Sequence, residues 1–194
     1  MNNTKRTISE SAIKVFSKNG YNGATMDAIA ADAGVAKGTL YYHFKSKEEI
    51  FKYIVQEGMN VLKGKIESDS KDVSDSLEKI RILCRVQWGL IYESRDFIKV
   101  IMSQIWGQEA RQLELRECIK SYIVYIQNYL KEAVDDGSIK KCNLSFLSYT
   151  LFGTVCSVAV YELMNEDKKD LDDMIESLMN YILNGIKVEK ENKI

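Results

Sequence analysis

Proline is absent from this chain of 194 residues, and glycine occurs only 11 times. Proline breaks helices because it lacks a hydrogen-bond donor and its ring clashes with the preceding turn. Without it, long uninterrupted helices are permitted throughout. Few stretches alternate strictly between apolar and polar residues, as a half-buried strand would. With 45% hydrophobic residues available for a core, we predict an all-α fold of about nine helices.

Clustered metal ligands are also lacking. The four cysteines, Cys84, Cys118, Cys142 and Cys156, form no C-x-x-C pair, and His43 is the one histidine. Such spacing gives little support to a metal site. The chain has no P-loop, no G-x-S-x-G or H-E-x-x-H motif and no glycine-rich dinucleotide turn. We therefore predict no catalytic residues, no metal, no cofactor and no enzymatic activity.

A secretory leader is not expected. Lys5, Arg6 and Glu10 interrupt the amino-terminal stretch in which one would lie. Widely spaced cysteines fit a reducing compartment. We therefore predict a cytoplasmic protein.

One long stretch lacks charge, since residues 142–161 hold no Asp, Glu, Lys or Arg. About twenty apolar residues are enough to cross a bilayer. Against a membrane span stand Asn143, several hydroxyl side chains and the lack of basic anchors on both sides. A helix that is apolar nearly all round is equally expected where one face meets its own domain and the other a second subunit. We favour the dimer helix and predict no membrane partner.

The formal net charge of −1 hides an uneven distribution. Residues 1–47 carry seven Lys or Arg against three acidic residues, a net charge of +4, so the rest carries −5. A basic end on an otherwise acidic chain suggests a polyanionic partner confined to that end. Solvated surface lysines would give the same charge, so the motif in this region has to decide.

Residues 25–47 predict two short helices joined by a tight turn. Residues 27–33 carry apolar side chains at helical spacing, and Thr25 is a plausible N-cap. Gly34 can adopt the left-handed conformation that ends this helix. A second helix then follows at residues 37–44.

The second helix has an unusual outer surface. Leu40 and Phe44 lie one turn apart and face the core. At about 100° per residue, the remaining positions present a cation, a glycine, hydroxyls and an imidazole to the outside: Lys37, Gly38, Thr39, Tyr41, Tyr42 and His43. Packing explains this surface poorly, whereas contact with nucleic-acid phosphates and base edges explains it well.

Residues 34–49, GVAKGTLYYHFKSKEE, resemble the helix-turn-helix signature of the tetracycline-repressor (TetR) family. The match is dense from residue 7 to residue 51, and beyond it the resemblance is one of architecture and length. It implies a DNA-binding transcriptional regulator, most often a repressor. The implied DNA-binding domain covers residues 1–50, with a linking helix from residue 47. An effector-binding and dimerisation domain then covers residues 51–194.

The resemblance also implies contacts on double-stranded DNA. It places Lys37 and Gly38 at base edges, Gly38 through its backbone, and Thr39 at a base or a phosphate. Phosphate or sugar–phosphate contacts are expected from Thr25, Tyr41, Tyr42, His43 and Lys47. The histidine could instead cap its helix at the edge of the core, and the two tyrosines could be plain surface aromatics.

Apolar spacing and helix-breaking residues place the other helices. A helix over residues 4–18, closed by Asn19-Gly20, should cover the two-helix unit. The capping box of residues 46–49 should start a helix that ends near Ile66. Its inward positions are Ile50, Phe51, Ile54, Val55, Val61 and Leu62. After a linker at residues 67–75, helices are predicted near residues 73–93, 96–105, 108–134, 144–164 and 171–187, before a frayed tail.

The middle helices mix aromatic side chains with a few polar tips, which suits a pocket for an amphipathic or aromatic small molecule. The resemblance favours this pocket, although core packing explains the same residues. Its expected lining is Cys84, Trp88, Tyr92, Met102, Trp106, Tyr122, Ile126 and Phe152. A ligand that binds better when the two DNA-binding domains of a dimer are spread apart would weaken operator binding. The alternative is that the same DNA-binding domain is controlled by a protein partner or acts without a ligand.

A single short reading helix makes too few contacts for useful specificity. We therefore predict a homodimer that places two such helices roughly 34 Å apart on a palindromic operator. The uncharged helix and the one after it would form an intersubunit four-helix bundle. The expected interface residues are Leu151, Val155, Val158, Leu171, Ile175, Leu178 and Ile182.

Overall fold

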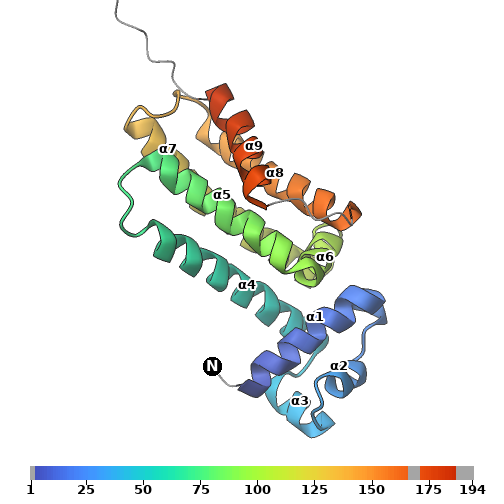
Figure 1. The fold of residues 1–194 in the computed structure, drawn as a ribbon. Coiled ribbons are helices and arrows are strands. Elements are labelled where there is room, and N and C mark those ends of the chain that lie inside the picture. Colours follow the sequence, from blue (N-terminus) through green and yellow to red (C-terminus); the bar gives the residue numbers. More distant parts are fainter. Residues whose placement is uncertain (1–2, 166–170, 187–194) are drawn as a thin grey trace, which may run out of the picture. The chain divides into compact units, whose positions relative to one another are not determined.

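The computed structural model describes residues 3–165 and 171–186. Within them it contains nine helices and no strand, which confirms the all-α prediction (Figure 1). The predicted helix end at Lys187, the tail beyond it and most of the break before Leu171 lie outside the described residues. The helices are α1 (Asn3–Gly23), α2 (Met26–Asp32), α3 (Lys37–His43), α4 (Lys47–Ser70), α5 (Ser76–Glu93), α6 (Arg95–Gln104), α7 (Ala110–Asp135), α8 (Leu144–Met164) and α9 (Leu171–Ile186).

The chain divides into two compact units. Unit 1 comprises Met1–Val61 and Ser94–Ile119, and unit 2 comprises Leu62–Glu93 and Lys120–Ile194. Unit 1 therefore contains α1 to α3, α6 and the first parts of α4 and α7. Unit 2 contains α5, α8, α9 and the remainders of α4 and α7.

Helix α1 packs on α2 and α6 in unit 1. The apolar stripe predicted from spacing is buried: Ile8, Ala12, Val15 and Phe16. Asn19-Gly20, predicted to close this helix, marks an interruption within it, because Gly20 has a φ of 70°, which favours glycine. The helix resumes after it and ends at Gly23, so the predicted end at Lys18 is too early.

The turn from α2 to α3 forms as predicted. Thr25 Oγ1 accepts a hydrogen bond from the Ala28 amide at 3.1 Å, which caps α2. Gly34 has a φ of 65°, and the Val35 amide donates to the Ala30 carbonyl at 3.0 Å. These contacts satisfy the last carbonyls of α2 and turn the chain into α3.

Helix α4 begins with the predicted capping residue. Ser46 Oγ accepts from the Glu49 amide at 3.3 Å, while the Glu49 carboxylate accepts from the Lys45 amide at 2.6 Å. Five of the six predicted inward positions are buried: Ile50, Phe51, Ile54, Val55 and Leu62. The same prediction for Val61 is wrong, because this side chain is 59% exposed. The helix also runs past Ile66 to Ser70.

Helix α6 approaches α1 and α4 closely within unit 1. Ser17 Oγ donates to Asp96 Oδ1 at 2.5 Å, which joins α1 to α6. On α4, a Cβ placed on Gly58 would lie 2.5 Å from Phe97 Cζ. A methyl group at position 58 would therefore have to displace the Phe97 ring where α4 and α6 approach each other.

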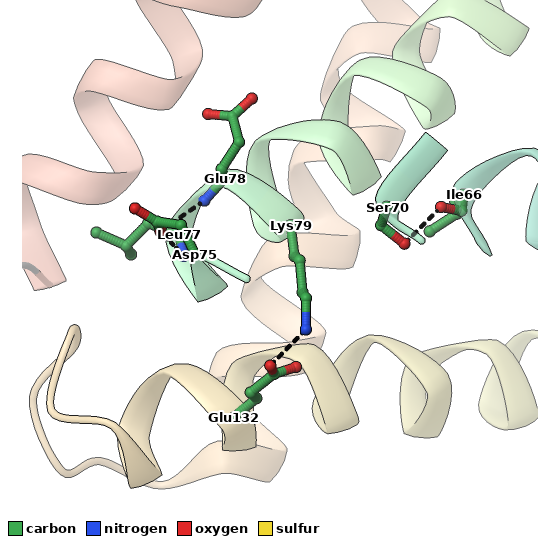
Figure 2. Close-up of polar contacts among 7 residues, drawn as sticks. All are labelled: Ile66, Ser70, Asp75, Leu77, Glu78, Lys79 and Glu132. Atoms are coloured by element: carbon green, nitrogen blue, oxygen red, sulfur yellow. Dashed lines mark hydrogen bonds and ion pairs between the residues drawn. The ribbon is translucent and has the colours of Figure 1, made fainter. Parts of the chain in front are cut away.

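Unit 2 is built around α5, which contacts α8 and α9. Its core includes Ile80, Leu83, Cys84, Trp88 and Ile91 of α5, Tyr122, Ile126 and Leu130 of α7, and Leu151 and Val158 of α8. Lys79 Nζ of α5 reaches Glu132 Oε1 of α7 at 2.5 Å (Figure 2). Apolar packing and one ion pair therefore hold α5 to its neighbours.

The predicted linker at residues 67–75 is shorter in the structure, where only residues 71–75 are not helical. Ser70 Oγ donates to the Ile66 carbonyl at 2.7 Å at the end of α4 (Figure 2). Asp75 Oδ1 accepts from the Leu77 and Glu78 amides at 2.8 and 3.1 Å, which caps α5 at Ser76 rather than near residue 73. Helices α6 to α8 begin and end within about two residues of their predicted bounds.

Candidate nucleic-acid interface

Helix α3 has an anchored side and an outward side, as predicted. Leu40 is 0% exposed and Phe44, which follows the helix, is 1% exposed. The Phe44 ring packs on Tyr53 of α4 with centroids 5.4 Å apart, and the Lys5 ammonium lies 4.1 Å from the Tyr53 centroid. These contacts hold the helix to unit 1 by its inner side.

The outward side of α3 exposes the predicted contact residues. Tyr42 is 78% exposed, and its ring meets that of His43 edge-on, with centroids 5.1 Å apart. The histidine is half-buried, and the others are exposed: Lys37, Gly38, Thr39, Tyr41 and Tyr42. A tyrosine this exposed contributes little to packing, which favours a contact role for it.

Two further positions leave room for a partner. A Cβ added at Gly38 would meet no protein atom within 4 Å, so packing within the chain does not require glycine there. A partner that approaches the α3 backbone closely would require it. Thr25 is exposed, and although its oxygen accepts from Ala28, its hydroxyl proton remains available to a phosphate.

Lys37 forms an ion pair on the outward surface. Its Nζ lies 2.6 Å from Asp27 Oδ2, and the two side chains are 67% and 59% exposed. The hydrogen bond to Asp27 and its negative charge raise the pKa of Lys37. The ammonium is therefore fixed as a cation beside α2, a contact that the sequence spacing did not indicate.

Lys47 has a different environment from the one predicted for it. Its Nζ donates to the carbonyls of Ala24 at 2.7 Å and Tyr21 at 2.9 Å, and it lies 3.5 Å from that of Asn22. An ammonium has three donors, and all three point at the chain's own backbone. The geometry does not support the expected phosphate contact, and we leave Lys47 out of the proposed contact set.

The residues expected to line an effector pocket fall in both units. In unit 2, Cys84, Trp88, Tyr122 and Ile126 are buried, while Tyr92 and Phe152 are half-buried. In unit 1, Met102 is half-buried and Trp106 is 80% exposed. The buried subset lies on α5 and α7 in the core of unit 2, where sequence alone could not separate packing from ligand contact.

The buried polar atoms of unit 2 that lack a hydrogen-bond partner among the described residues include Gln87 Oε1, Trp88 Nε1 and Tyr122 Oη. Burial raises the pKa of the Cys84 thiol to about 12, and it also raises the pKa of Tyr122, with the thiol as a second cause. Cys84 of α5 therefore lies near enough to Tyr122 of α7 to act on its ionisation, and Trp88 lies one helical turn further along α5. Gln87, one of the polar side chains that the sequence places among these aromatic residues, lies three residues from Cys84 on the same helix.

The residues expected at a dimer interface are divided in the same way. Leu151, Val158 and Ile175 are 3%, 4% and 2% exposed within the single chain. They belong to the core of unit 2, so their assignment to a subunit interface is corrected. Val155, Leu178 and Ile182 are half-buried. The side chain of Leu171 lies outside the described residues.

Large apolar side chains remain exposed elsewhere on α8 and α9. They are Phe146, Tyr149, Val160, Met164 and Tyr181, at 73%, 51%, 43%, 79% and 78%. Tyr181 also borders a groove between the two helices with Tyr161 and Leu178. Helix α8 is long and apolar enough to cross a membrane, but such a helix is weak evidence on its own, and 22% of its most apolar stretch is buried.

Among residues 3–165 and 171–186, no three His, Cys, Asp or Glu side chains come together closely enough to hold a metal ion. The groups that the outward α3 surface offers to a partner are hydroxyls, a cation, an imidazole and an open backbone.

Two family models match this chain. One described as "Bacterial regulatory proteins, tetR family" matches residues 8–54, and one described as "YsiA-like protein, C-terminal region" matches residues 55–185. The first match includes α3 and all of the candidate contact residues. The second covers more than half of the chain, including all of α5 to α8.

Individual relatives match over nearly their full length. The fatty acid metabolism regulator protein of Bacillus subtilis (strain 168) is 31% identical over 186 residues, covering 92% of this chain and 93% of the relative. The negative transcriptional regulator IcaR of the Staphylococcus epidermidis biofilm operon icaADBC is 41% identical over 187 residues, covering 92% and 98%. The crystal structure of the transcriptional regulator FadR from Bacillus subtilis in complex with stearoyl-CoA superposes with a TM-score of 0.84 at 27% identity, covering 93% and 98%.

Proposed function

Because this chain belongs to the TetR family of bacterial DNA-binding transcriptional regulators, we propose that it is a repressor whose operator complex is released by a long-chain acyl thioester. The family membership confirms the prediction of a DNA-binding transcriptional regulator that is not an enzyme.

The division of α3 carries the DNA-binding part of the proposal. Leu40 and Phe44 fix the helix by its inner side, so the outward residues meet DNA on a rigid base. Base contacts come from Lys37, Gly38 and Thr39, and backbone contacts from Thr25, Tyr41, Tyr42 and His43. The DNA-binding domain covers residues 1–50, and residues 51–194 bind the effector and dimerise.

The protein acts as a homodimer on a palindromic operator. Two copies of α3 would have to sit roughly 34 Å apart to enter successive major grooves on one side of the duplex. Exposed apolar side chains on α8 and α9, among them Tyr181 and Met164, supply a surface that a second subunit would bury. A cytoplasmic location follows from access to the operator.

The effector proposal rests on the buried unpaired donors of unit 2. The Trp88 indole and the Tyr122 hydroxyl each lack an acceptor among the described residues, and an unsatisfied buried donor costs about 1–3 kcal/mol. A carbonyl oxygen between apolar walls would satisfy such a donor, and an acyl thioester supplies both the carbonyl and an apolar chain. The Bacillus subtilis FadR complex with stearoyl-CoA supports this class of ligand.

Release follows a population shift. The ligand binds unit 2 more tightly when the DNA-binding domains of the dimer are not spaced to match the two half-sites. This difference in ligand affinity weakens operator binding by the same free energy. The coupling is therefore reciprocal, and operator DNA should weaken acyl thioester binding.

The experiment uses the full chain in two steps. Selection from a random DNA pool first recovers the operator, which should be a palindrome. Fluorescence anisotropy on that operator then measures release by stearoyl-CoA, with free coenzyme A and stearate as controls. Trp88→Phe and Tyr122→Phe should raise the stearoyl-CoA concentration needed for release about 3- to 10-fold, while operator affinity without ligand stays at the wild-type value.

Two results would count against the proposal. Recovery of no preferred DNA sequence would remove the operator. An operator complex that stearoyl-CoA leaves intact, but that a protein captured from lysate dissociates, would favour the alternative in which a protein partner controls the head.

A further inference from the structure

Asp27 places a carboxylate on the surface that is proposed to meet DNA. It is the second residue of α2, and its Oδ2 lies 2.6 Å from the ammonium of Lys37, the first residue of α3. The pair spans the turn between the two helices. Both side chains are more than half exposed, so a DNA ligand can reach them.

Helix stability does not explain Lys37. A helix N-terminus carries partial positive charge, so a cation at the first position is unfavourable there. The N-cap of α3 is Ala36, which makes no side-chain capping bond. Lys37 therefore occupies a position where its charge opposes the helix, and Asp27 offsets that charge.

Ion-pair stability does not explain Asp27 either. An exposed pair contributes only about 0–1 kcal/mol, and a carboxylate near phosphates adds repulsion to every DNA complex. An acidic side chain in the first turn of α2 interacts favourably with the helix N-terminus. An acidic residue at another position of that turn would give the same benefit. The feature left to explain is the short contact with one particular lysine.

We propose that Asp27 is a positioning residue for DNA recognition, which orients the Lys37 ammonium toward base edges and withholds it from phosphates. This inference rests on the proposed base-reading role of Lys37. One ammonium donor is used by Asp27, and two remain for the O6 and N7 acceptors of a guanine. A free lysine on its flexible stem would instead reach the nearest phosphate on any sequence.

Specificity arises from this restriction. On unrelated DNA, Lys37 stays paired, and the Asp27 charge repels the backbone. On the operator, the ammonium meets base acceptors without leaving the carboxylate. Asp27 therefore lowers affinity for unrelated sequences without lowering affinity for the operator.

The test is Asp27→Asn, with Glu10→Gln as the matched control. Glu10 is paired with Arg6 in unit 1 at 2.7 Å with similar exposure, so both variants remove one exposed, paired carboxylate. Affinities for the selected operator and for an unrelated duplex of equal length are measured over a range of salt concentrations. Thermal melting of each variant separates any effect on α2 stability.

Asp27→Asn should bind the unrelated duplex about 3- to 10-fold more tightly, and the slope of log affinity against log salt should steepen by about one phosphate contact. Operator affinity should stay the same or fall, so the specificity ratio falls. Glu10→Gln should leave the ratio at the wild-type value. Equal changes of the ratio in the two variants would overturn the inference, because net charge would then suffice.

Lys37→Met provides the second arm. In that background, Asp27→Asn should produce no further fall of the ratio, since the side chain that it positions is gone. An undiminished fall would mean that Asp27 acts on DNA directly and would overturn the inference alone. A wild-type ratio in Lys37→Met would overturn both the inference and the proposed base contact.

Discussion

Lys47 donates from its Nζ to the carbonyl oxygen of Ala24 at 2.7 Å, and this bond joins the first residue of α4 to the segment that ends α1. The carbonyl of Tyr21 accepts from the same ammonium at 2.9 Å, and the Tyr21 ring centroid lies 4.9 Å from it. The guanidinium of Arg111 lies 3.9 Å from the same centroid. Lys47 therefore closes the three-helix head.

Lys47→Met should lower the free energy of unfolding by about 2 kcal/mol, because carbonyls at the end of α1 lose their charged donor. The salt dependence of DNA binding should keep the wild-type slope, since the donors of this ammonium are used by backbone carbonyls. Urea denaturation and anisotropy titrations measure the two quantities. Lys18→Met, at an exposed position of α1, is the control and should be near neutral for stability. A flatter salt slope in Lys47→Met than in the control would restore the phosphate contact.

Gly58 and Gly64 of α4 should respond to alanine in opposite directions. A Cβ at Gly58 would meet Phe97 Cζ at 2.5 Å, whereas one at Gly64 would meet nothing within 4 Å. Gly58→Ala should therefore cost about 1–3 kcal/mol of stability by forcing Phe97 aside. Gly64→Ala should gain about 0.5–1 kcal/mol from helix propensity. Thermal melting of the two variants checks both signs, and equal stabilisation would contradict the close approach of α4 and α6.

Tyr42→Ala should weaken operator and unrelated DNA by the same factor, about 3- to 10-fold. The reason is that a backbone contact carries no sequence information. Because the side chain is 78% exposed, the melting temperature should not change. Tyr42→Phe separates the hydroxyl from the ring and should reproduce most of the loss. A loss confined to the operator would mean that Tyr42 reads a base.

Cys84 and Cys142 should differ sharply in reactivity. Burial raises the pKa of Cys84 to about 12, so its thiol stays protonated at pH 8, whereas Cys142 is exposed. Only thiolate reacts with alkylating agents. Iodoacetamide at pH 8 should modify Cys142 within minutes and Cys84 only on unfolding, which peptide mass mapping would detect.

The raised pKa of Cys84 also makes stability depend on pH. An unfolded thiol ionises near pH 8.5, so stability should decline as the pH rises above that value.

Local signals predicted the head well. Gly34 ends α2 with a positive φ, Thr25 caps it, and Leu40 and Phe44 are buried. Each of these depends on neighbours within a few residues, and such patterns appear directly in the sequence. The same holds for α8, whose bounds agree with those predicted.

Contacts between distant residues were not predictable in this way. The three carbonyls that bind Lys47 lie 23 to 26 residues before it, and Asp27 lies ten residues before Lys37. The assignment of α8 residues to a subunit interface was wrong for another reason. Its apolar side chains surround it, so no stripe indicated that Leu151 and Val158 are buried within unit 2 and not at a subunit interface.

Tyr181→Glu should convert the protein to a monomer. Tyr181 is 78% exposed and borders the groove between α8 and α9, so a carboxylate there would be buried without a partner on dimerisation, which costs several kcal/mol. Val124→Glu is the control, because Val124 is also exposed in unit 2, at 57%, but lies on α7. Sedimentation equilibrium at micromolar concentration should give a monomer for the first variant and a dimer for the second. Operator affinity should fall with dimerisation, while affinity for unrelated DNA should change much less, because one head still contacts the backbone. A stable dimer in Tyr181→Glu would place the subunit interface away from this groove, and loss of the dimer in Val124→Glu would place it on α7.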